Sequence, residues 1–253
     1  MRGRIQYYPS LDSTNLECRR LAEKGAPDGT VVIADCQTAG RGRLGRSFES
    51  PQGLGLYLSV LWHPHCAAES LLPLTALAAV AAVRAVERVS GIRCGIKWPN
   101  DLVLHGKKVA GILTESSLCE NGAVSCVIVG IGINLRQRPG DFSPDVAVIA
   151  SSLEAESGTS VDGAALADAL IAELDTLYAE ALPHPERWVA EYRAACLNPG
   201  RAVQVIRPDG TRLRARALDI DAQFGLMVQY PDGTVETLRS GEVSVRGLYG
   251  YAE

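Results

Sequence analysis

Gly-Arg-Gly-Arg-Leu-Gly-Arg, at residues 40–46, is the stretch that decides between two classes of fold. Its glycines at positions 40, 42 and 45 satisfy the pattern G-x-G-x-x-G, which in dinucleotide-binding folds follows a strand and opens a helix. Here Ser-Pro-Gln-Gly follows at residues 50–53, and an apolar strand follows at 55–62. The stretch therefore predicts a loop between two strands and argues against a parallel dinucleotide-binding sheet.

The same loop carries concentrated positive charge. Arg41, Arg43 and Arg46 fall within six residues, and the glycines between them let backbone amides come close to an anion. Such a loop suits phosphate groups or an acyl phosphate. The alternative is a solvated basic surface loop, but the interleaved glycines favour a binding role.

Outward from the loop, the first four-fifths of the chain contains both helical and strand patterns. Thr14 and Glu17 fit a capping box at the start of the first helix. Residues 136–161 are rich in loop-forming residues. The periodicity predicts helices at 12–24, 73–90, 162–181 and 185–196, and strands at 30–34, 55–62, 92–97, 102–104, 109–115 and 124–133. These patterns predict an α+β fold.

The sequence pattern changes near Asn198. From residue 201 to 246, short alternating strands are separated by two copies of the turn Pro-Asp-Gly-Thr, at 208–211 and 231–234. About fifty residues of this pattern predict a small SH3-like β-barrel. We therefore divide the chain into an N-terminal domain at 1–197, which carries the loop, and a C-terminal SH3-like domain at 198–253.

Composition excludes several classes of protein. A formal net charge of −4 and a pI near 5.7 provide no basic footprint for nucleic acid. The most apolar stretch, 71–83, is shorter than the roughly 20 residues that span a bilayer, so it is interpreted as a buried helix. The seven cysteines form no CxxC pair, and the N-terminus has no signal-peptide core. We expect a soluble cytoplasmic protein with no membrane partner.

Two lysines stand in unusual surroundings. Lys97 lies between an apolar strand and Trp98, and Lys108 opens an apolar run. A lysine at a strand end is usually a solvated edge charge, so neither residue alone indicates a site.

Together, four motifs resemble those of biotin–protein ligases. They are Gly-Arg-Gly-Arg at 40–43, Lys-Trp-Pro-Asn-Asp at 97–101, Lys-Val-Ala-Gly-Ile-Leu at 108–113 and Gly-Ile-Gly-Ile-Asn at 130–134. Ser-Thr-Asn at 13–15 with Gln37 is similar to an earlier motif of that family, and 240–245 is similar to its C-terminal domain. The resemblance covers nearly the whole chain, from Tyr7 to Gly247.

The resemblance implies a fold and a domain organisation. The expected core is like that of class II aminoacyl-tRNA synthetases, a mixed, mainly antiparallel sheet with helices on one face. Some family members carry an N-terminal helix-turn-helix that represses transcription. Because the first motif here begins at Ser13, we expect a form that lacks this DNA-binding domain.

The activity implied is a two-step ligation. Biotin and ATP form biotinyl-5'-AMP with release of pyrophosphate, and the biotinyl group then passes to a lysine of a biotin carboxyl carrier domain. ATP is expected to enter with Mg²⁺, whose ligands the sequence does not identify. A homodimer built on an exposed sheet edge is possible by analogy with the family.

The resemblance also assigns candidate residues. Lys108 would bridge the biotin carboxylate and the α-phosphate, and Arg43 and Lys97 would neutralise the phosphates. Asp101 would orient Lys97, contact metal or help deprotonate the incoming lysine. The catalytic candidates are Lys108, Arg43, Lys97 and Asp101. The candidates for biotin are Ser13, Thr14, Gln37, Gly40, Arg41, Gly111 and Ile112. Those for ATP and the adenylate are Gly42, Arg43, Arg46, Phe48, Asn100, Lys108 and Asn134.

Several of these residues have plainer interpretations. Ser13 and Thr14 can simply cap the first helix. Gln37 and Asn134 can be ordinary polar residues at strand ends, and Asp101 an ordinary turn aspartate. At Phe48 the family usually has a tryptophan that folds over adenine, and phenylalanine keeps the stacking face with less area and no indole N–H.

Two other functions compete. A lipoate or octanoyl ligase or transferase shares the core fold, but the Gly-Arg-Gly-Arg loop and the C-terminal barrel argue against it. A non-catalytic adaptor built on an SH3-like barrel would have no use for the loop arginines together with Lys108.

Overall fold

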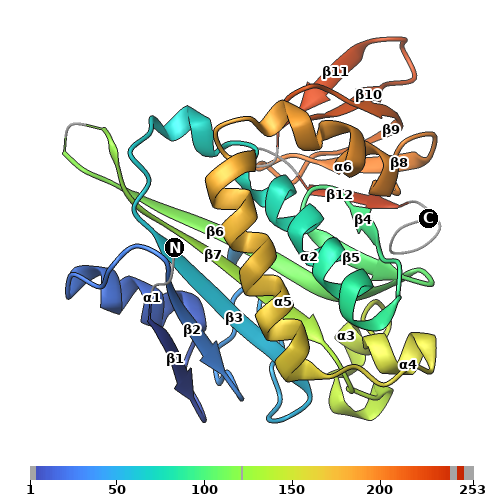
Figure 1. The fold of residues 1–253 in the computed structure, drawn as a ribbon. Helices are drawn as coiled ribbons and strands as arrows, with labels where there is room; N and C mark the ends of the chain where they lie inside the picture. The colour runs from blue at the N-terminus through green and yellow to red at the C-terminus, as the bar shows by residue number, and fades with distance from the viewer. Residues whose placement is uncertain (1–3, 121, 240–243, 248–253) are drawn as a thin grey trace.

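The computed structural model describes residues 4–120, 122–239 and 244–247. A large sheet spans the N-terminal part of these residues, with strand order β1-β2-β3-β7-β6-β5-β4 (Figure 1). The strands are β1 (Ile5–Tyr8), β2 (Thr30–Ala34), β3 (Gly55–Trp62), β4 (Gly95–Lys97), β5 (Asp101–Leu104), β6 (Lys107–Leu118) and β7 (Val124–Asn134). The predicted strands at 30–34 and 55–62 are confirmed to the residue.

The sheet is mixed and mainly antiparallel. β1 pairs in parallel with β2, and the other neighbours pair antiparallel. Because β2 and β3 are antiparallel neighbours, the stretch at 40–46 is a loop between two strands and does not open a long helix. β1 was not predicted from the sequence. It is a four-residue edge strand whose Ile5 and Tyr7 remain exposed, so it lacks a buried apolar stripe.

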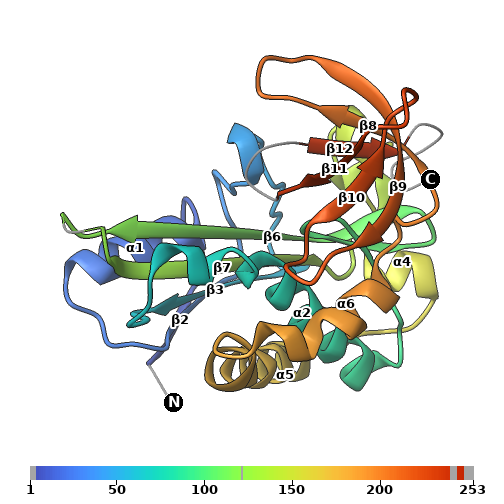
Figure 2. The same cartoon turned by 90° about the horizontal axis from the view of Figure 1, so that it is seen from above.

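Alternation along the strands divides the sheet into two faces. On β2, Val31 and Ile33 join the main core, whereas Val32 packs into a smaller cluster with Cys18 on α1 (Thr14–Glu23). Figure 2 shows α2 (Leu74–Ser90), α5 (Gly163–Thr176) and α6 (Val189–Ala195) on one side of the sheet. The fold expected from the resemblance is present, with α1 as an additional cover on the opposite face.

The alanine-rich helix α2 is the centre of the main core. Eleven of its residues are buried, and it ends at Gly91, whose φ of 70° is the left-handed conformation favoured at helix C-termini. By length and composition, Ala68–Ser90 is apolar enough to cross a membrane, but 61% of the relevant window is buried inside the protein. The interpretation of 71–83 as part of a buried helix is confirmed.

The region between β7 and α5 is less irregular than predicted. Two short helices, α3 (Pro144–Ala147) and α4 (Leu153–Ser157), interrupt the segment at 136–161. Both are a turn or so in length, which is too short for apolar periodicity to mark them.

A second, antiparallel sheet forms the C-terminal module, in the order β11-β10-β9-β8-β12. Its strands are β8 (Ala202–Ile206), β9 (Arg212–Ile220), β10 (Leu226–Gln229), β11 (Val235–Leu238) and β12 (Ser244–Gly247). The two predicted turns are confirmed: Asp209 and Asp232 each accept a backbone N–H two residues on, and Gly210 and Gly233 have positive φ. The main core continues into this module, so the boundary at 198 stays a prediction.

Candidate active site

A cavity of about 970 Å³ opens on the face of the large sheet opposite α2. Its walls come from the start of α1, the loop after β2, the β4–β5 turn, strands β6 and β7, and the segment around α3. Every candidate residue from the sequence lines this cavity except Gly40, which lines a smaller neighbouring cavity of about 380 Å³. Segments far apart in the chain thus meet at one place.

The floor of the cavity is made of glycines on β6 and β7. Gly111 and Gly132 are paired across the two strands, and Gly130 lies two residues before Gly132. A Cβ on Gly132 would lie 2.5 Å from the Phe48 ring, and a Cβ on Gly130 would lie 1.9 Å from Asn15 Oδ1. The glycines of the two motifs therefore leave room for side chains that lie on the sheet.

The same alternation turns the Ile112 side chain away from the cavity. Ile112 is buried in the main core together with its strand neighbour Ala110. Ile112 faces the site through its carbonyl, which accepts a hydrogen bond from Asn100 Nδ2 at 2.9 Å. Any contact of this residue with ligand is therefore a backbone contact.

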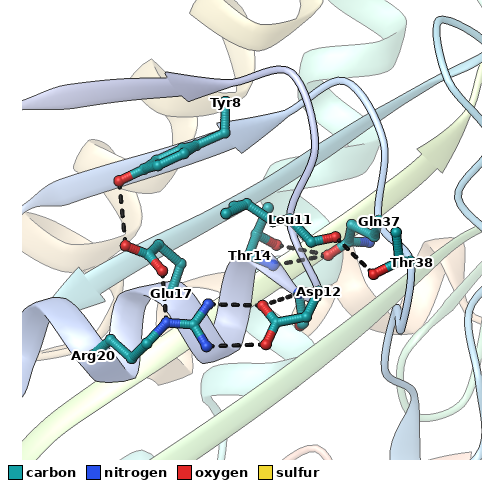
Figure 3. A network of polar contacts seen from close by, with 9 residues as sticks. Tyr8, Leu11, Asp12, Thr14, Glu17, Arg20, Gln37 and Thr38 are labelled. Carbon is teal, nitrogen blue, oxygen red and sulfur yellow. Dashed lines mark hydrogen bonds and ion pairs between the residues drawn. The ribbon is translucent and has the colours of Figure 1, made fainter.

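One end of the cavity is lined by neutral polar groups. Gln37 Oε1 accepts from the backbone N–H of Thr14 at 2.9 Å and lies 3.1 Å from the Thr14 hydroxyl (Figure 3). Gln37 Nε2 donates to Ser50 at 2.8 Å. Ser13 is the N-cap residue of α1, but its side chain makes no capping hydrogen bond. The capping box predicted from Thr14 and Glu17 is wrong, because both side chains have partners elsewhere.

Three residues at this end were not among the sequence candidates. Asn15 Oδ1 accepts from Ser59 at 2.6 Å, and Asn15 Nδ2 donates to Glu115 at 2.8 Å. Glu115 also forms an ion pair with Arg41 at 3.1 Å. Ser59 carried a signal in the sequence, since it is the one serine in the otherwise apolar and aromatic strand β3. Asn15 belongs to the Ser-Thr-Asn motif of the sequence but was given no role there, and Glu115 carried no signal without its partners.

A charged network holds the segment that leads into α1. Arg20 donates two hydrogen bonds to Asp12, at 2.7 and 2.9 Å, and a third to Glu17, which accepts from Tyr8 (Figure 3). Asp12 also accepts the backbone N–H of Ser13 at 2.7 Å. The bond from Arg20 is the main reason that the pKa of Asp12 is lowered to about 2. The network thus fixes the chain where Ser13 and Thr14 meet the cavity.

The cationic loop is closed on itself by backbone hydrogen bonds. Phe48 N–H donates to the Gly40 carbonyl at 2.9 Å, and Gly42 N–H donates to the Arg46 carbonyl at 2.7 Å. Between them Arg43 donates to Asn100 at 3.2 Å. Burial lowers the pKa of the Arg43 guanidinium, although an arginine remains charged at neutral pH. The loop therefore presents a fixed positive charge to the cavity.

Opposite the loop, Lys108 and Asp101 form an ion pair. Lys108 Nζ lies 2.7 Å from Asp101 Oδ1 and 5.9 Å from the centre of the Phe48 ring. Lys97, at the end of β4, is buried to 6% exposure and lines the same wall. The observed partner of Asp101 is Lys108, which was not among the roles expected for Asp101. The Phe48 ring lies over the glycine floor beside this pair.

Asn134 is the last residue of β7 and lines the same cavity. Its Nδ2 donates to the Ser151 carbonyl at 2.9 Å, and its Oδ1 accepts from Gln137 at 3.2 Å. Gln137 is a further buried residue that the sequence interpretation missed. Among the described residues, no group of three or more His, Cys, Asp and Glu side chains is placed to hold a metal ion.

Comparison with known protein families identifies the two parts of the chain. Residues 7–134 match the model of the Biotin/lipoate A/B protein ligase family, which is half of the chain. The chain belongs to this family. Residues 200–246 match the biotin protein ligase C terminal domain, so the C-terminal sheet is the SH3-like domain of such ligases.

Individual relatives agree with the family. The chain is 36% identical over 242 residues to the bifunctional ligase/repressor BirA of Bacillus subtilis, covering 94% of this chain and 73% of that protein. It is 41% identical over 198 residues to the biotin--[acetyl-CoA-carboxylase] ligase of Paracoccus denitrificans, covering 74% and 79%. The structure of the Aquifex aeolicus biotin protein ligase with biotin and ATP superposes with a TM-score of 0.79 at 28% identity, covering 96% and 99%.

Both family matches argue against the two competing functions, the non-catalytic adaptor and the lipoate ligase. A non-catalytic adaptor does not account for a match that runs from within β1 to the end of β7 and includes the loop after β2. A lipoate ligase shares the first family model, but the second model describes the C-terminal domain of biotin protein ligases.

Proposed function

We propose that this chain is an ATP-dependent biotin–protein ligase that forms biotinyl-5'-AMP and then biotinylates a lysine of a biotin carboxyl carrier domain. The observation that carries the proposal is the ion pair of Lys108 with Asp101 on the wall of a cavity that also receives Arg43 and Lys97. The first step brings together two anions, so its site must supply positive charge. The family membership supports biotin as the acid that is activated.

We place biotin at the neutral end of the cavity. The ureido group needs donors and acceptors without net charge, which Ser13, Thr14 and Gln37 offer. Gly40 and Arg41 would close this end, and Gly111 with the backbone of Ile112 would lie beneath the bicycle. Gly111 is suited to this because a Cβ there would come within 3.1 Å of Lys108.

In the first step, a carboxylate oxygen of biotin attacks the α-phosphorus of ATP and pyrophosphate leaves. Lys108 would bridge the carboxylate and the α-phosphate, where negative charge accumulates in the transition state. Arg43 and Lys97 would neutralise the remaining phosphate oxygens. Asp101, 2.7 Å from Lys108, would hold the ammonium in position.

Mg²⁺ would enter with ATP as part of the substrate. Magnesium in nucleotide sites is held by one or two carboxylates together with phosphates and water, and the acids on the cavity wall meet that need. These acids are Glu49, Asp101 and Asp145. The ion would supply additional neutralisation of the phosphates.

We place the adenylate at the end of the cavity beside α3. Phe48 would give a stacking face, and Asn134 would read the base through its amide. Gly42 and Arg46 would contact the phosphate side, with Asn100 holding Arg43 in place. In the second step the lysine amine of the carrier attacks the mixed anhydride, AMP leaves and the amine loses a proton. We assign the reaction to the cytoplasm, where ATP is present.

The test is biotin-dependent exchange of pyrophosphate into ATP by the purified chain. We expect exchange with biotin and none with lipoate, followed by transfer to a biotin carboxyl carrier domain. Exchange that lipoate supports equally well would favour the lipoate branch of the family. Retention of biotin with no exchange would exclude the ligase proposal.

A further inference from the structure

Gln137 is a fully buried glutamine that touches the proposed base-reading residue without lining the cavity. Its exposure is 0%, and its Nε2 lies 3.2 Å from Asn134 Oδ1 and 3.3 Å from Tyr57 Oη. Its backbone carbonyl accepts from the Ser152 hydroxyl at 2.8 Å. Its Oε1 is buried and accepts no hydrogen bond from the described residues. Such an arrangement costs free energy, so it calls for an explanation.

The direction of these hydrogen bonds follows from their two ends. At one end is the Pro51 carbonyl, which can only accept, so the Tyr57 hydroxyl donates to it at 3.0 Å. Having used its proton, Tyr57 can only accept from Gln137. The amide of Gln137 must therefore turn its NH₂ group toward Tyr57, and with it toward Asn134.

The other end imposes the same direction. The Ser151 carbonyl also only accepts, so Asn134 turns Nδ2 toward it at 2.9 Å. This leaves Asn134 Oδ1 to accept from Gln137. A reversed Asn134 amide would put oxygen against the Ser151 carbonyl and NH₂ against the Gln137 NH₂. Two carbonyls thus fix both amides, and Asn134 keeps one N–H and one lone pair for the cavity that it lines.

We propose that Gln137 is the positioning residue that locks the Asn134 amide and thereby makes the ligase select 6-aminopurine over 6-oxopurine nucleotides. The inference rests on the proposed role of Asn134. An asparagine amide offers an acceptor for the 6-amino group and a donor for a ring nitrogen of adenine. A 6-oxopurine has an acceptor at position 6 and a proton on N1, so it suits the reversed amide.

The experiment compares ATP with inosine triphosphate in biotin-dependent pyrophosphate release. Gln137→Glu replaces the NH₂ group by an acceptor, and we expect the ratio of kcat/KM for ATP to that for inosine triphosphate to fall about tenfold or more. Gln137→Met removes the polar partner at similar length and is expected to lower the ratio less. Gln229→Glu makes the same chemical change at an exposed position of β10 in the C-terminal sheet and should leave the ratio unchanged.

The outcomes separate selectivity from stability. If Gln137→Glu fails to fold, the ratio measured for Gln137→Met decides, with its melting temperature recorded beside it. A folded variant whose two kcat/KM values fall equally would overturn the inference. Asn134→Ala distinguishes the underlying proposal: an unchanged ratio there removes Asn134 as the base reader. A lowered ratio in Asn134→Ala with wild-type ratios in both Gln137 variants removes only the role of Gln137.

Discussion

Lys107 and Lys108 are adjacent in the chain but have different surroundings. Lys107 Nζ donates to the Val148 carbonyl at the surface, whereas Lys108 lies in the cavity wall against Asp101. The sequence predicted Lys108 as a candidate but not its partner. The reason is the irregular register between β5 and β6, which pairs Lys108 with Val103 and leaves Asp101 opposite Gly111. A bulge of this kind carries no local sequence signal.

Replacing Lys108 by alanine tests the electrostatic role at the scale of one residue. We expect adenylate formation to fall about a hundredfold or more, because the variant lacks a preorganised charge that acts mainly in the transition state. Lys107→Ala removes an equal charge one residue away and should keep most of the wild-type rate. The measurement is biotin-dependent pyrophosphate exchange. Near wild-type exchange by Lys108→Ala would remove this lysine from the mechanism.

The lowered pKa of Asp12 predicts how the free energy of unfolding changes at acid pH. Its folded pKa of about 2 lies below the ordinary value of 3.8, because Arg20 hydrogen-bonds to the carboxylate. A lowered folded pKa contributes stability that is fully present above the unfolded pKa and lost as pH falls through the folded one. Asp12→Asn should therefore be less stable than wild type at about pH 5, and the difference should shrink toward about pH 2. Urea unfolding at several pH values measures it, and a difference independent of pH would contradict it.

At the scale of elements, the sequence predicted most of the sheet because apolar strands with clear ends carry their own signal. β2 and β3 have such ends, whereas β1 has no buried stripe and was missed. The start of α1 was misinterpreted for another reason. Thr14 matches a capping pattern, but a hydroxyl beside Gln37 and Ser59 bonds across the fold instead. At a site of this kind, hydrogen-bond partners from elsewhere in the fold override the local sequence pattern.

The loop after β2 is an element whose shape depends on one glycine. A Cβ on Gly40 would lie 2.3 Å from the Phe48 carbonyl, which is backbone and cannot rotate away. Gly40→Ala should therefore open the closure between Gly40 and Phe48 and displace the loop arginines. We expect a severalfold higher KM for ATP, measured by pyrophosphate exchange.

Gly140→Ala is the matched control for this loop prediction. A Cβ at Gly140 meets nothing within 4 Å, and its backbone does not have a positive φ. This variant should keep the wild-type KM. Equal KM values for the two variants would show that the close approach at Gly40 does not set the loop geometry.

At the scale of the whole molecule, the C-terminal module is joined to the β4–β5 turn. Trp98 Nε1 donates to the Phe224 carbonyl at 2.9 Å, and the backbone N–H of Trp98 donates to Asn198 Oδ1 at 2.7 Å. The turns of the module were predicted because Pro-Asp-Gly-Thr acts locally. The contact between Trp98 and Phe224 was not, since it joins residues 126 positions apart. The module thus contacts the segment that carries Lys97, Asn100 and Asp101.

Trp98→Phe tests whether this contact matters to the enzyme. The variant keeps an aromatic ring but removes the indole donor, so the buried Phe224 carbonyl loses its partner at a cost of about 1–3 kcal/mol. Trp62→Phe is a matched control, because Trp62 is equally buried and its Nε1 has no hydrogen-bond partner among the described residues. Both variants shrink a buried ring by the same amount, so the difference between their free energies of unfolding isolates the hydrogen bond. If the module also holds the β4–β5 turn in place, Trp98→Phe should lower pyrophosphate exchange and carrier biotinylation, while Trp62→Phe keeps both. Equal loss of stability and equal activity in the two variants would reduce the contact to packing.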